Sequence, residues 1–232
     1  EKRREKLAIF CSIDPENAVS APDVNSIYDI PVNFESEKLG EKILKKLKLK
    51  PRKKDLVEWR NFVEKSKNAK KIVKIGIIGK YFETGEYILA DSYISVIESV
   101  KHASWELGIK PEMVWLSSTE YEKSPHKLKE IKNLDGIIVP GGFGSRGIEG
   151  KIAVAKFCRE NKIPYLGLCY GMQIATIEFA RNVCGLKNAN SEEMNPKTPD
   201  PVIHIMEDQK KKLKIKNYGG SMRLGAYDCE LK

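Results

Sequence analysis

Short segments of mainly aliphatic residues recur along the chain from residue 71 onward, and each is followed by a segment with helical spacing. Strands that are apolar throughout, rather than at every second residue, are typical of a parallel sheet covered on both faces. Their alternation with helices predicts an α/β domain with a mostly parallel sheet and helices on both faces. The expected strands are Ile72–Ile78, Met113–Leu116, Gly136–Val139 and Ile163–Leu168. The expected helices run from about Ser92 to Leu107 (with Val96, Ile97, Val100 and Ala103 facing inward), Gly150 to Asn161 and Gly171 to Arg181.

The first 70 residues lack this alternation of apolar strands and helices, and they divide into two parts. Residues 1–35 begin with the apolar run Leu7–Cys11, which we expect to be a strand, and they are too short for a domain of their own. Residues 36–70 carry apolar side chains at helical spacing, interrupted by Pro51, which predicts two amphipathic linker helices. Because the chain starts without Met and stops without an obvious end signal, we expect it to be part of a longer protein.

The excess of positive charge is confined to one stretch of the sequence. The 232 residues carry a net charge of +9, yet Lys38–Lys74 alone holds 15 basic and 4 acidic side chains. The rest of the chain holds 26 basic and 28 acidic side chains, and no aromatic stacking surface accompanies the basic stretch. We therefore interpret these Lys side chains as solvated faces of the linker helices and expect no binding of nucleic acid.

The sequence disfavours several other classes of protein. No apolar run approaches the roughly 18 residues of a membrane-spanning helix, and no secretory signal follows the charged N-terminus. Five cysteines without regular spacing do not make a disulfide framework. We expect a reduced, cytoplasmic setting without a membrane partner, and we identify no metal site.

The segment Gly167–Gly171 has the form Gly-x-Cys-x-Gly and stands between a predicted strand and a predicted helix. In this arrangement the nucleophile lies on a turn so sharp that side chains on either side of it would collide. Cys169 would then point to the carboxyl edge of the sheet, near a helix N-terminus whose dipole favours a thiolate. We predict that Cys169 is a catalytic nucleophile. The other cysteines lack this setting and are expected to be packing residues: Cys11, Cys158, Cys184 and Cys229.

A second glycine-rich segment, Pro140–Gly144, follows the neighbouring predicted strand. Its backbone N–H groups can face the crevice and stabilise the oxyanion that forms when Cys169 attacks a carbonyl group. A plain turn is the alternative for this segment alone, and its pairing with the Cys169 turn favours the oxyanion hole. It is not a phosphate-binding loop, because the Lys and the Ser or Thr that end such a loop are absent.

Together, the segments Pro140–Gly144 and Gly167–Gln173 resemble the motifs of class I, or triad, glutamine amidotransferases. More narrowly, nearly the whole chain resembles the CTP synthase family. The stretches that carry this narrower resemblance are Lys6–Cys11, Ser26–Pro31, Gly79–Tyr81, Arg146–Lys151, Asn188–Ser191 and Gly219–Gly225. The resemblance implies the end of a synthetase domain over residues 1–35, a basic helical interdomain linker over 36–70 and a flavodoxin-like, C-terminally truncated glutamine amidotransferase domain over 71–232.

The resemblance also implies an activity and its ligands. Members of the family hydrolyse L-glutamine to glutamate and ammonia, and a synthetase domain then aminates UTP to CTP at the expense of ATP with Mg²⁺. GTP activates the glutaminase step, CTP inhibits the enzyme, no prosthetic group is used, and the enzyme is usually a tetramer. The phosphate-binding loop and the Mg²⁺ ligands expected near the start of the synthetase domain are absent from this sequence.

The resemblance assigns roles position by position. Cys169 matches the nucleophile, and Gly142 and the backbone N–H of Tyr170 match the oxyanion donors, although the family usually has Leu at the latter position. The glutamine-binding positions are Gly142, Tyr170, Gly171, Met172, Gln173 and Glu193, of which the Glu193 carboxylate suits the α-ammonium group of glutamine. The positions matched to nucleotide binding are Lys6, Pro22, Asp23 and Val24, and those matched to the GTP response are Phe143, Arg146, Gly147 and Glu149.

The expected triad is incomplete in this sequence. The family completes it with a His and a Glu in a His-Pro-Glu motif far beyond the nucleophile, and no such motif is present. Of the three histidines, His102, His126 and His204, only His204 follows Cys169, and its nearest acid is three residues on. We expect His204 to be an ordinary strand residue and the chain alone to lack the base that the chemistry needs.

Two other functions stay open. A different class I amidotransferase subunit, or a hydrolase with a Cys elbow, would share Cys169, but a free-standing subunit would not need the residues before Lys71. A catalytically inactive module for assembly or regulation would account for the missing His and Glu if Lys232 is the natural C-terminus.

Overall fold

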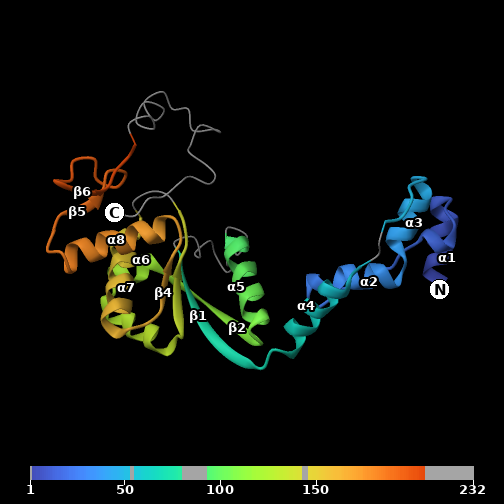
Figure 1. The fold of residues 1–232 in the computed structure, drawn as a ribbon, viewed down its shortest axis with the longest axis horizontal. Coiled ribbons are helices and arrows are strands. Elements are labelled where there is room, and N and C mark those ends of the chain that lie inside the picture. Colours follow the sequence, from blue (N-terminus) through green and yellow to red (C-terminus); the bar gives the residue numbers. More distant parts are fainter. Residues whose placement is uncertain (1, 53–54, 80–92, 143–145, 207–232) are drawn as a thin grey trace. The chain divides into compact units, whose positions relative to one another are not determined.

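The structure is a computed structural model that describes residues 2–52, 55–79, 93–142 and 146–206. The chain divides into two compact units, whose elements are labelled in Figure 1. One unit comprises the residues up to Ile72 together with Val100–Lys110, and the other comprises Val73–Ser99 and the residues from Pro111 on. The positions singled out in the sequence that lie outside the described residues are Lys80, Tyr81, Ser92, Phe143, Gly144, Gly219–Gly225 and Cys229.

The first unit is helical. Its elements are α1 (Lys2–Cys11), the 3-10 helices η1 (Pro15–Asn17) and η2 (Ile27–Asp29), α2 (Ile30–Ser36), α3 (Leu39–Lys46) and α4 (Val57–Asn68). Helices α3 and α4 confirm the two amphipathic helices predicted from the spacing of apolar residues. The buried ring of Tyr28 packs against Trp59 and Phe62 of α4, and the Trp59 indole N–H donates to the Tyr28 carbonyl at 2.9 Å. The core of this unit is therefore largely aromatic.

The second unit contains a four-stranded sheet in the order β2-β1-β3-β4. These strands are β1 (Lys71–Gly79), β2 (Ile109–Ser117), β3 (Gly136–Val139) and β4 (Tyr165–Gly167). Strand β3 is parallel to both of its neighbours, with Ile137 opposite Gly76 of β1 and Ile138 opposite Leu166 of β4. The mostly parallel sheet predicted from the apolar strands is confirmed.

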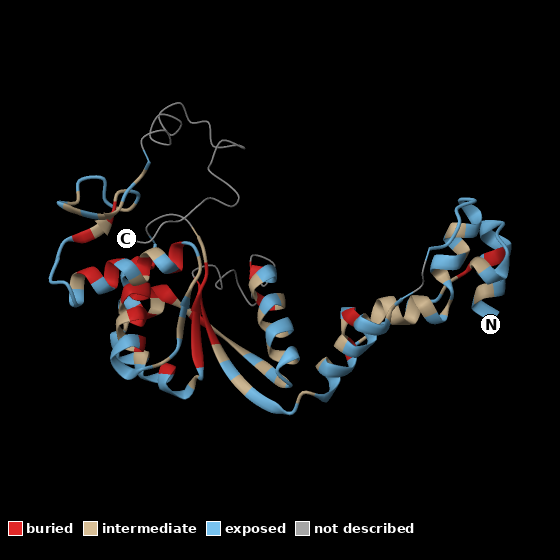
Figure 2. Ribbon diagram, in the orientation of Figure 1, coloured by how far each residue is buried: buried red, intermediate tan, exposed pale blue. Residues whose placement is uncertain are grey.

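Helices follow the strands in the predicted alternation. They are α5 (Ile94–Glu106), α6 (Ser118–Lys123), the 3-10 helix η4 (Pro125–Asn133), α7 (Ile148–Asn161) and α8 (Tyr170–Asn182), and a small parallel pair of strands follows, β5 (Ala189–Ser191) and β6 (Asp200–Ile203). Buried residues concentrate in β3, in the end of β1 and along α7 and α8 (Figure 2). Ile152 of α7 and Ile174 of α8 belong to one apolar cluster, so the two helices pack on each other.

Two polar and steric details fix the position of α7. A Cβ at Gly150 would lie 1.9 Å from the carbonyl oxygen of Ser118, so only glycine lets α7 approach α6 this closely. Farther along α7, the Arg159 guanidinium donates through Nε and Nη2 to the buried Glu178 carboxylate of α8, at 2.8–3.2 Å. These contacts hold the helix that follows the glycine-rich segment.

The expectation of a strand at Leu7–Cys11 was wrong, because these residues form the end of helix α1. Ala8 is buried there, whereas Phe10 is 86 % exposed. An apolar run of five residues does not separate a strand from a helix, and the Lys, Arg and Glu residues that precede it are good helix formers. Three smaller expectations were also wrong: Ala103, Cys11 and Cys184 are exposed rather than packed inside. Cys158 is fully buried, as predicted.

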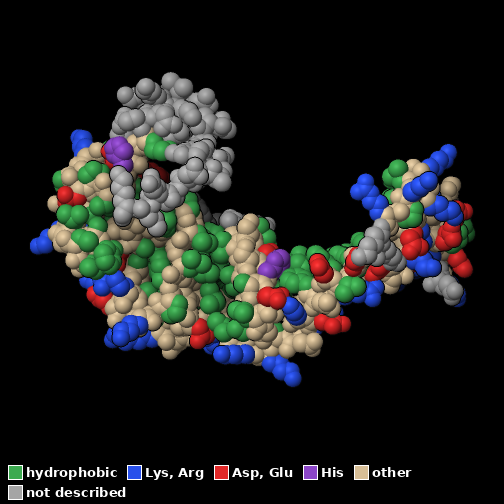
Figure 3. Space-filling view, viewed as in Figure 1, with side chains coloured by type: hydrophobic (Ala, Val, Ile, Leu, Met, Phe, Trp, Pro, Cys, Tyr) green, Lys and Arg blue, Asp and Glu red, His purple; other side chains and the backbone are tan. Residues whose placement is uncertain are grey.

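Charged side chains of both signs are interspersed on the face shown in Figure 3, and the Lys and Arg side chains do not gather into one patch there. Within the described ranges, no helix combines the length and the apolar character that crossing a membrane requires. The same part of the chain holds no cluster of three or more His, Cys, Asp or Glu side chains suited to a metal ion.

Candidate active site

The backbone of Cys169 has an unusual conformation, with φ 51° and ψ −104°. A positive φ is rare for a residue with a side chain and strains the backbone. Residues strained in this way cluster at functional sites. Cys169 stands directly between β4 and α8 and is exposed. The Cys169 carbonyl accepts the N–H groups of Met172 and Gln173 at 3.1 and 3.2 Å, so the helix begins immediately behind the thiol. This geometry fits the sharp nucleophile turn predicted from the sequence.

Both glycines of the turn are required by close backbone contacts. A Cβ at Gly167 would lie 2.5 Å from the carbonyl carbon and oxygen of Gly171, and a Cβ at Gly171 would lie 1.9 Å from the carbonyl oxygen of Val139. The Tyr165 hydroxyl also donates to the Gly171 carbonyl at 2.9 Å. The turn is thus packed against β3 and held by a side chain of β4.

The glycine-rich segment after β3 lies against Cys169. A Cβ built at Gly141 would be 3.5 Å from the Cys169 Cβ and 3.8 Å from its sulfur. The Leu168 N–H donates to the Val139 carbonyl at 2.9 Å, which joins the ends of β3 and β4. The structure therefore brings together two motifs that start 27 residues apart in the sequence, with Gly142 next to the residue that contacts the thiol.

Tyr170 follows Cys169 and is the first residue of α8. Its N–H therefore lies at the positive end of the helix dipole, which suits it to an oxyanion. Burial of the ring, and to a lesser degree the nearby Glu193 carboxylate, raises the pKa of the Tyr170 hydroxyl to about 12. Lys151 of α7 is also buried, and its ammonium lies 5.4 Å from the centre of the Tyr170 ring.

Two predicted glutamine-binding residues lie beside this turn. The Oε1 atom of Gln173 is inaccessible to solvent and accepts no hydrogen bond within the described ranges, so an acceptor is held ready for a donor. Glu193 is exposed, and its carboxylate is close enough to the Tyr170 hydroxyl to contribute to its raised pKa. The Glu193 N–H donates to the Ser191 Oγ at 3.0 Å, which fixes its backbone to β5. Met172 is 58 % exposed on the first turn of α8.

The residues matched to the GTP response lie at the start of α7. Gly147 has φ +73°, and a Cβ there would lie 2.4 Å from the Ser118 Oγ, so this glycine is required by the fold itself. Arg146 is exposed. The Glu149 carboxylate accepts two hydrogen bonds, both at 3.0 Å, from Nη1 of Arg181.

The three histidines take different positions, and no hydrogen bond joins any of them to Cys169 in the described ranges. The His204 Nδ1 lies 2.9 Å from Glu192 Oε1, so Glu192, which precedes it in the sequence, is an acid partner of His204. His102 is hydrogen-bonded to the Tyr28 hydroxyl, and His126 is exposed in η4.

The residues matched to nucleotide binding belong to the helical unit. Lys6 is exposed on α1. Pro22, Asp23 and Val24 line a hollow of about 330 Å³ together with residues of α2, among them Phe34. Its lining combines apolar side chains with the polar side chains of Asp23 and Asn33.

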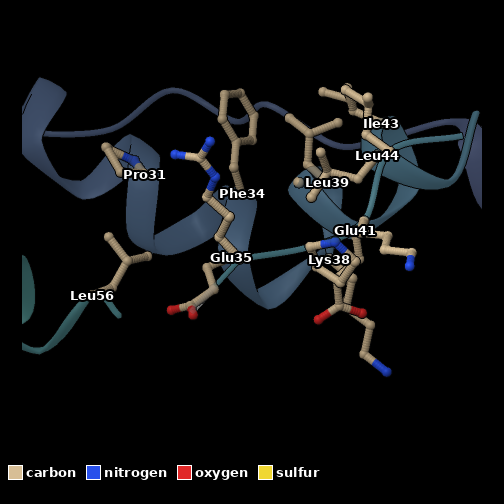
Figure 4. A pocket seen from close by; sticks show the side chains of 14 residues that line it. Pro31, Phe34, Glu35, Lys38, Leu39, Glu41, Ile43, Leu44 and Leu56 are labelled. Atoms are coloured by element: carbon tan, nitrogen blue, oxygen red, sulfur yellow. The ribbon is translucent and has the colours of Figure 1, made fainter. Parts of the chain in front are cut away.

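A second hollow of about 1010 Å³ on the helical unit shares Phe34 with the first. This unit contains neither Cys169 nor the glycine-rich segment. Figure 4 shows the apolar side chains of the second hollow, including Phe34, Leu39 and Leu56, with Glu35 and Glu41 nearby. Its size alone indicates no reaction, and the predicted nucleophile Cys169 belongs to the other unit.

Arg181 and Tyr165, which bond to residues of this region, were not predicted from the sequence. Each is hydrogen-bonded to a residue outside its own helix or strand, so no local sequence pattern identifies it. Lys151 was considered only as part of a motif in the sequence. In the structure it is buried beside an aromatic ring, which is uncommon for a Lys side chain.

Known families and proteins match the chain along its length. The family model described as glutamine amidotransferase class-I matches residues 88–231, and that described as CTP synthase N-terminus matches residues 1–49. The chain is 47% identical to the CTP synthase of Sulfurisphaera tokodaii and 48% identical to that of Methanocaldococcus jannaschii, in each case over 100% of this chain and 42% of the relative. It thus spans about two fifths of the length of these curated relatives.

A solved structure is also similar. The glutaminase domain of Trypanosoma brucei CTPS with bound acivicin shares 40% of its sequence with the matched part of this chain, with a TM-score of 0.53. The match covers 58% of this chain and 50% of the solved chain. The likeness supports the same α/β fold around Cys169.

Proposed function

The chain belongs to the class I glutamine amidotransferase family, and from this we propose that it is the glutaminase part of a CTP synthase, together with the linker and the end of the synthetase domain. The observation that carries the proposal is the strained Cys169 at the start of α8, which lies against Gly141 of the glycine-rich segment. We assign residues 1–35 to the synthetase domain, 36–70 to the linker and 71–232 to the amidotransferase domain.

In the proposed reaction, the Cys169 thiolate attacks the side-chain carbonyl carbon of L-glutamine. The carbonyl oxygen becomes an oxyanion that the N–H groups of Gly142 and Tyr170 stabilise, and removal of one such donor typically costs 10² to 10³ in turnover. The C–N bond then breaks, ammonia leaves with a proton from a general acid, and a thioester forms on the sulfur. Water hydrolyses the thioester, which releases glutamate and restores the thiol.

Two polar side chains would bind the other polar groups of the glutamine substrate. The Glu193 carboxylate would pair with the α-ammonium group, and the Oε1 of Gln173, which has no partner among the described residues, would accept a hydrogen bond from the substrate. The acid and base steps need a further group, since no His is bonded to Cys169 in the described ranges. We assign this group to a part of the whole protein outside this chain, which the greater length of the relatives supports.

The whole protein would use the released ammonia to aminate UTP to CTP with ATP and Mg²⁺, with GTP as activator and CTP as inhibitor, as a cytoplasmic homo-oligomer. Lys6 would contact the pyrimidine nucleotide, and Pro22, Asp23 and Val24 would lie near the base of ATP, which the hollow beside them supports. Arg146, Gly147 and Glu149, together with Phe143, would respond to GTP. The described residues form no cluster that suits a metal ion, so no step of this chain is assigned to Mg²⁺.

The test compares glutamine-dependent and ammonia-dependent synthesis of CTP by the whole protein and its Cys169→Ala variant. We expect the variant to lose the glutamine-dependent reaction and to keep the ammonia-dependent one, because only ammonia release needs the thiol. Loss of both activities in a folded variant would contradict the role of Cys169. Glutamine hydrolysis without any formation of CTP would favour another class I amidotransferase, and no activity of either kind would favour a module for assembly or regulation.

A further inference from the structure

Arg181 is bonded to two segments that lie far from it in the sequence. It stands on the last turn of α8, the helix that begins at the nucleophile turn, and its side chain is 18% exposed. Its Nε donates to the carbonyl of Ala189 at 2.7 Å, and its Nη1 donates to both carboxylate oxygens of Glu149 at 3.0 Å. One guanidinium group thus connects α8, β5 and the first turn of α7.

The Ala189 contact leads to the segment that carries Glu193. Ala189 begins β5 and is fully buried, so its backbone cannot shift without disturbing the packing around it. Strand β5 ends at the buried Ser191, whose Oγ accepts the N–H of Glu193 at 3.0 Å. The position of Glu193 therefore depends on β5, which Arg181 ties to α8; Figure 1 shows β5 beyond one end of that helix.

The Glu149 contact leads to the other wall of the site. Glu149 lies on the first turn of α7, two residues after Gly147, where the chain is locked against Ser118. Strand β3 and the glycine-rich segment, with Gly141 against Cys169, immediately precede this region. Arg181 thus spans from the helix that follows the glycine-rich segment to the strand that leads to Glu193.

We propose that Arg181 is a positioning residue for glutamine binding, which holds the Glu193 segment in register with the start of α7. This inference rests on the proposed glutaminase function. The role requires Arg, because Nε and Nη1 serve two acceptors in different directions, whereas Lys has a single nitrogen at the end of its side chain. Arg181 touches neither Cys169 nor the oxyanion donors in the described ranges, so it acts on substrate binding rather than on the chemical step.

The test measures the KM for glutamine and the kcat of glutamine hydrolysis in the whole protein. Hydrogen bonds to charged groups contribute enough that Arg181→Lys should raise KM about tenfold, while kcat stays within about twofold. Arg181→Met, which removes both contacts, should raise KM at least as much. Glu149→Gln keeps the Ala189 contact and should raise KM only about threefold, and the double variant Glu149→Gln, Arg181→Lys should raise KM no further than Arg181→Lys alone.

Arg159→Lys is the matched control. Arg159 also joins α7 and α8 through a carboxylate, that of the buried Glu178, but it makes no contact with β5. We expect this variant to lower the thermal midpoint and to leave the KM for glutamine unchanged. An equal rise in KM in Arg159→Lys would show that any loosening of the two helices has this effect, and would overturn the proposal.

An unchanged KM in Arg181→Lys, with the protein folded, would overturn the proposal as well. If the Arg181 variants do not fold, the KM of Glu149→Gln measured without GTP decides, because this substitution weakens one anchor by removing its charge and keeps the shape of the side chain. Failure of the proposed function itself is seen separately, since the unaltered protein would then release no Cys169-dependent ammonia.

Discussion

Gly171 packs directly on the backbone of Val139, so closely that a Cβ at Gly171 would lie 1.9 Å from the Val139 carbonyl oxygen. The contact joins the first turn of α8 to the end of β3, and Cys169 lies two residues before it. Both motifs of the site are therefore held in place by a close contact between the backbones of α8 and β3, which leaves no room for a side chain at Gly171.

Gly171→Ala should destroy the glutaminase activity by displacing α8. The new methyl group meets backbone on β3, which cannot rotate away as a flexible side chain would, and overpacking of this kind costs about 1–3 kcal/mol or more. We expect glutamine-dependent turnover to fall at least a hundredfold and the thermal midpoint of the protein to fall. Gly40→Ala is the control, since nothing lies within 4 Å of a Cβ there and α3 should gain about 0.5–1 kcal/mol. Near-normal turnover in Gly171→Ala would contradict the tight turn.

Gln173→Leu should weaken glutamine binding without destabilising the protein. The buried Oε1 of Gln173 has no hydrogen-bond partner within the described ranges, and an unpaired buried polar atom costs about 1–3 kcal/mol. Replacing the amide with an apolar group of similar size removes that cost and also the acceptor offered to the substrate. We expect an unchanged or higher thermal midpoint together with a KM for glutamine at least tenfold higher.

Thr176→Val on the exposed side of the same helix is the control for Gln173→Leu, and its KM should not change. A variant Gln173→Leu with normal KM would show that the Oε1 atom faces no substrate. A marked loss of stability would show that the amide has a structural partner instead.

The sheet and the sharp turn at Cys169 were predictable from the sequence because both depend on local patterns. Continuous aliphatic runs identify the strands, and the glycines on either side of Cys169 follow from steric limits on a sharp turn. The stretch Leu7–Cys11 shows where such patterns fail. Five apolar residues fit a strand or a helix equally well, and the charged residues before them favoured the helix.

The residues that hold the site together could not be predicted in the same way. Arg181 bonds to Glu149, 32 residues before it, and the pair is recognisable only once α7 and α8 are packed. His204 likewise has a partner in Glu192, twelve residues earlier, where the sequence suggested only an acid that follows it. The exposure of Cys184 depends on where α8 ends, and the spacing of apolar residues does not predict the last residue of a helix.

The isolated 232-residue chain should release no ammonia from glutamine in a Cys169-dependent manner. Cysteine chemistry of this kind needs a base and an acid, and no His is bonded to Cys169 in the described ranges. The measurement is ammonia release by the chain and by its Cys169→Ala variant, with circular dichroism to establish that both are folded. Cys169-dependent release would contradict the expectation, and His204, which already has an acid partner in Glu192, would be the first residue to substitute.

Cys158 should make the protein less stable as the pH rises above 9. Burial within α7 raises the pKa of its thiol from 9.0 to about 12. Between these values the folded protein keeps a proton that the unfolded chain has released, so each rise in pH favours unfolding. This group should cost about 2 kcal/mol between pH 9 and pH 11.

The measurement is the free energy of unfolding by denaturant at pH 8, 9, 10 and 11, under reducing conditions, for the unaltered protein and for Cys158→Val. The valine fills a similar volume without a proton to lose. The variant should therefore become more stable relative to the unaltered protein as the pH rises. Cys184→Ser, which changes an exposed thiol, controls for oxidation. A difference that stays constant over this range would mean that the Cys158 thiol ionises as readily in the folded protein as in the unfolded chain.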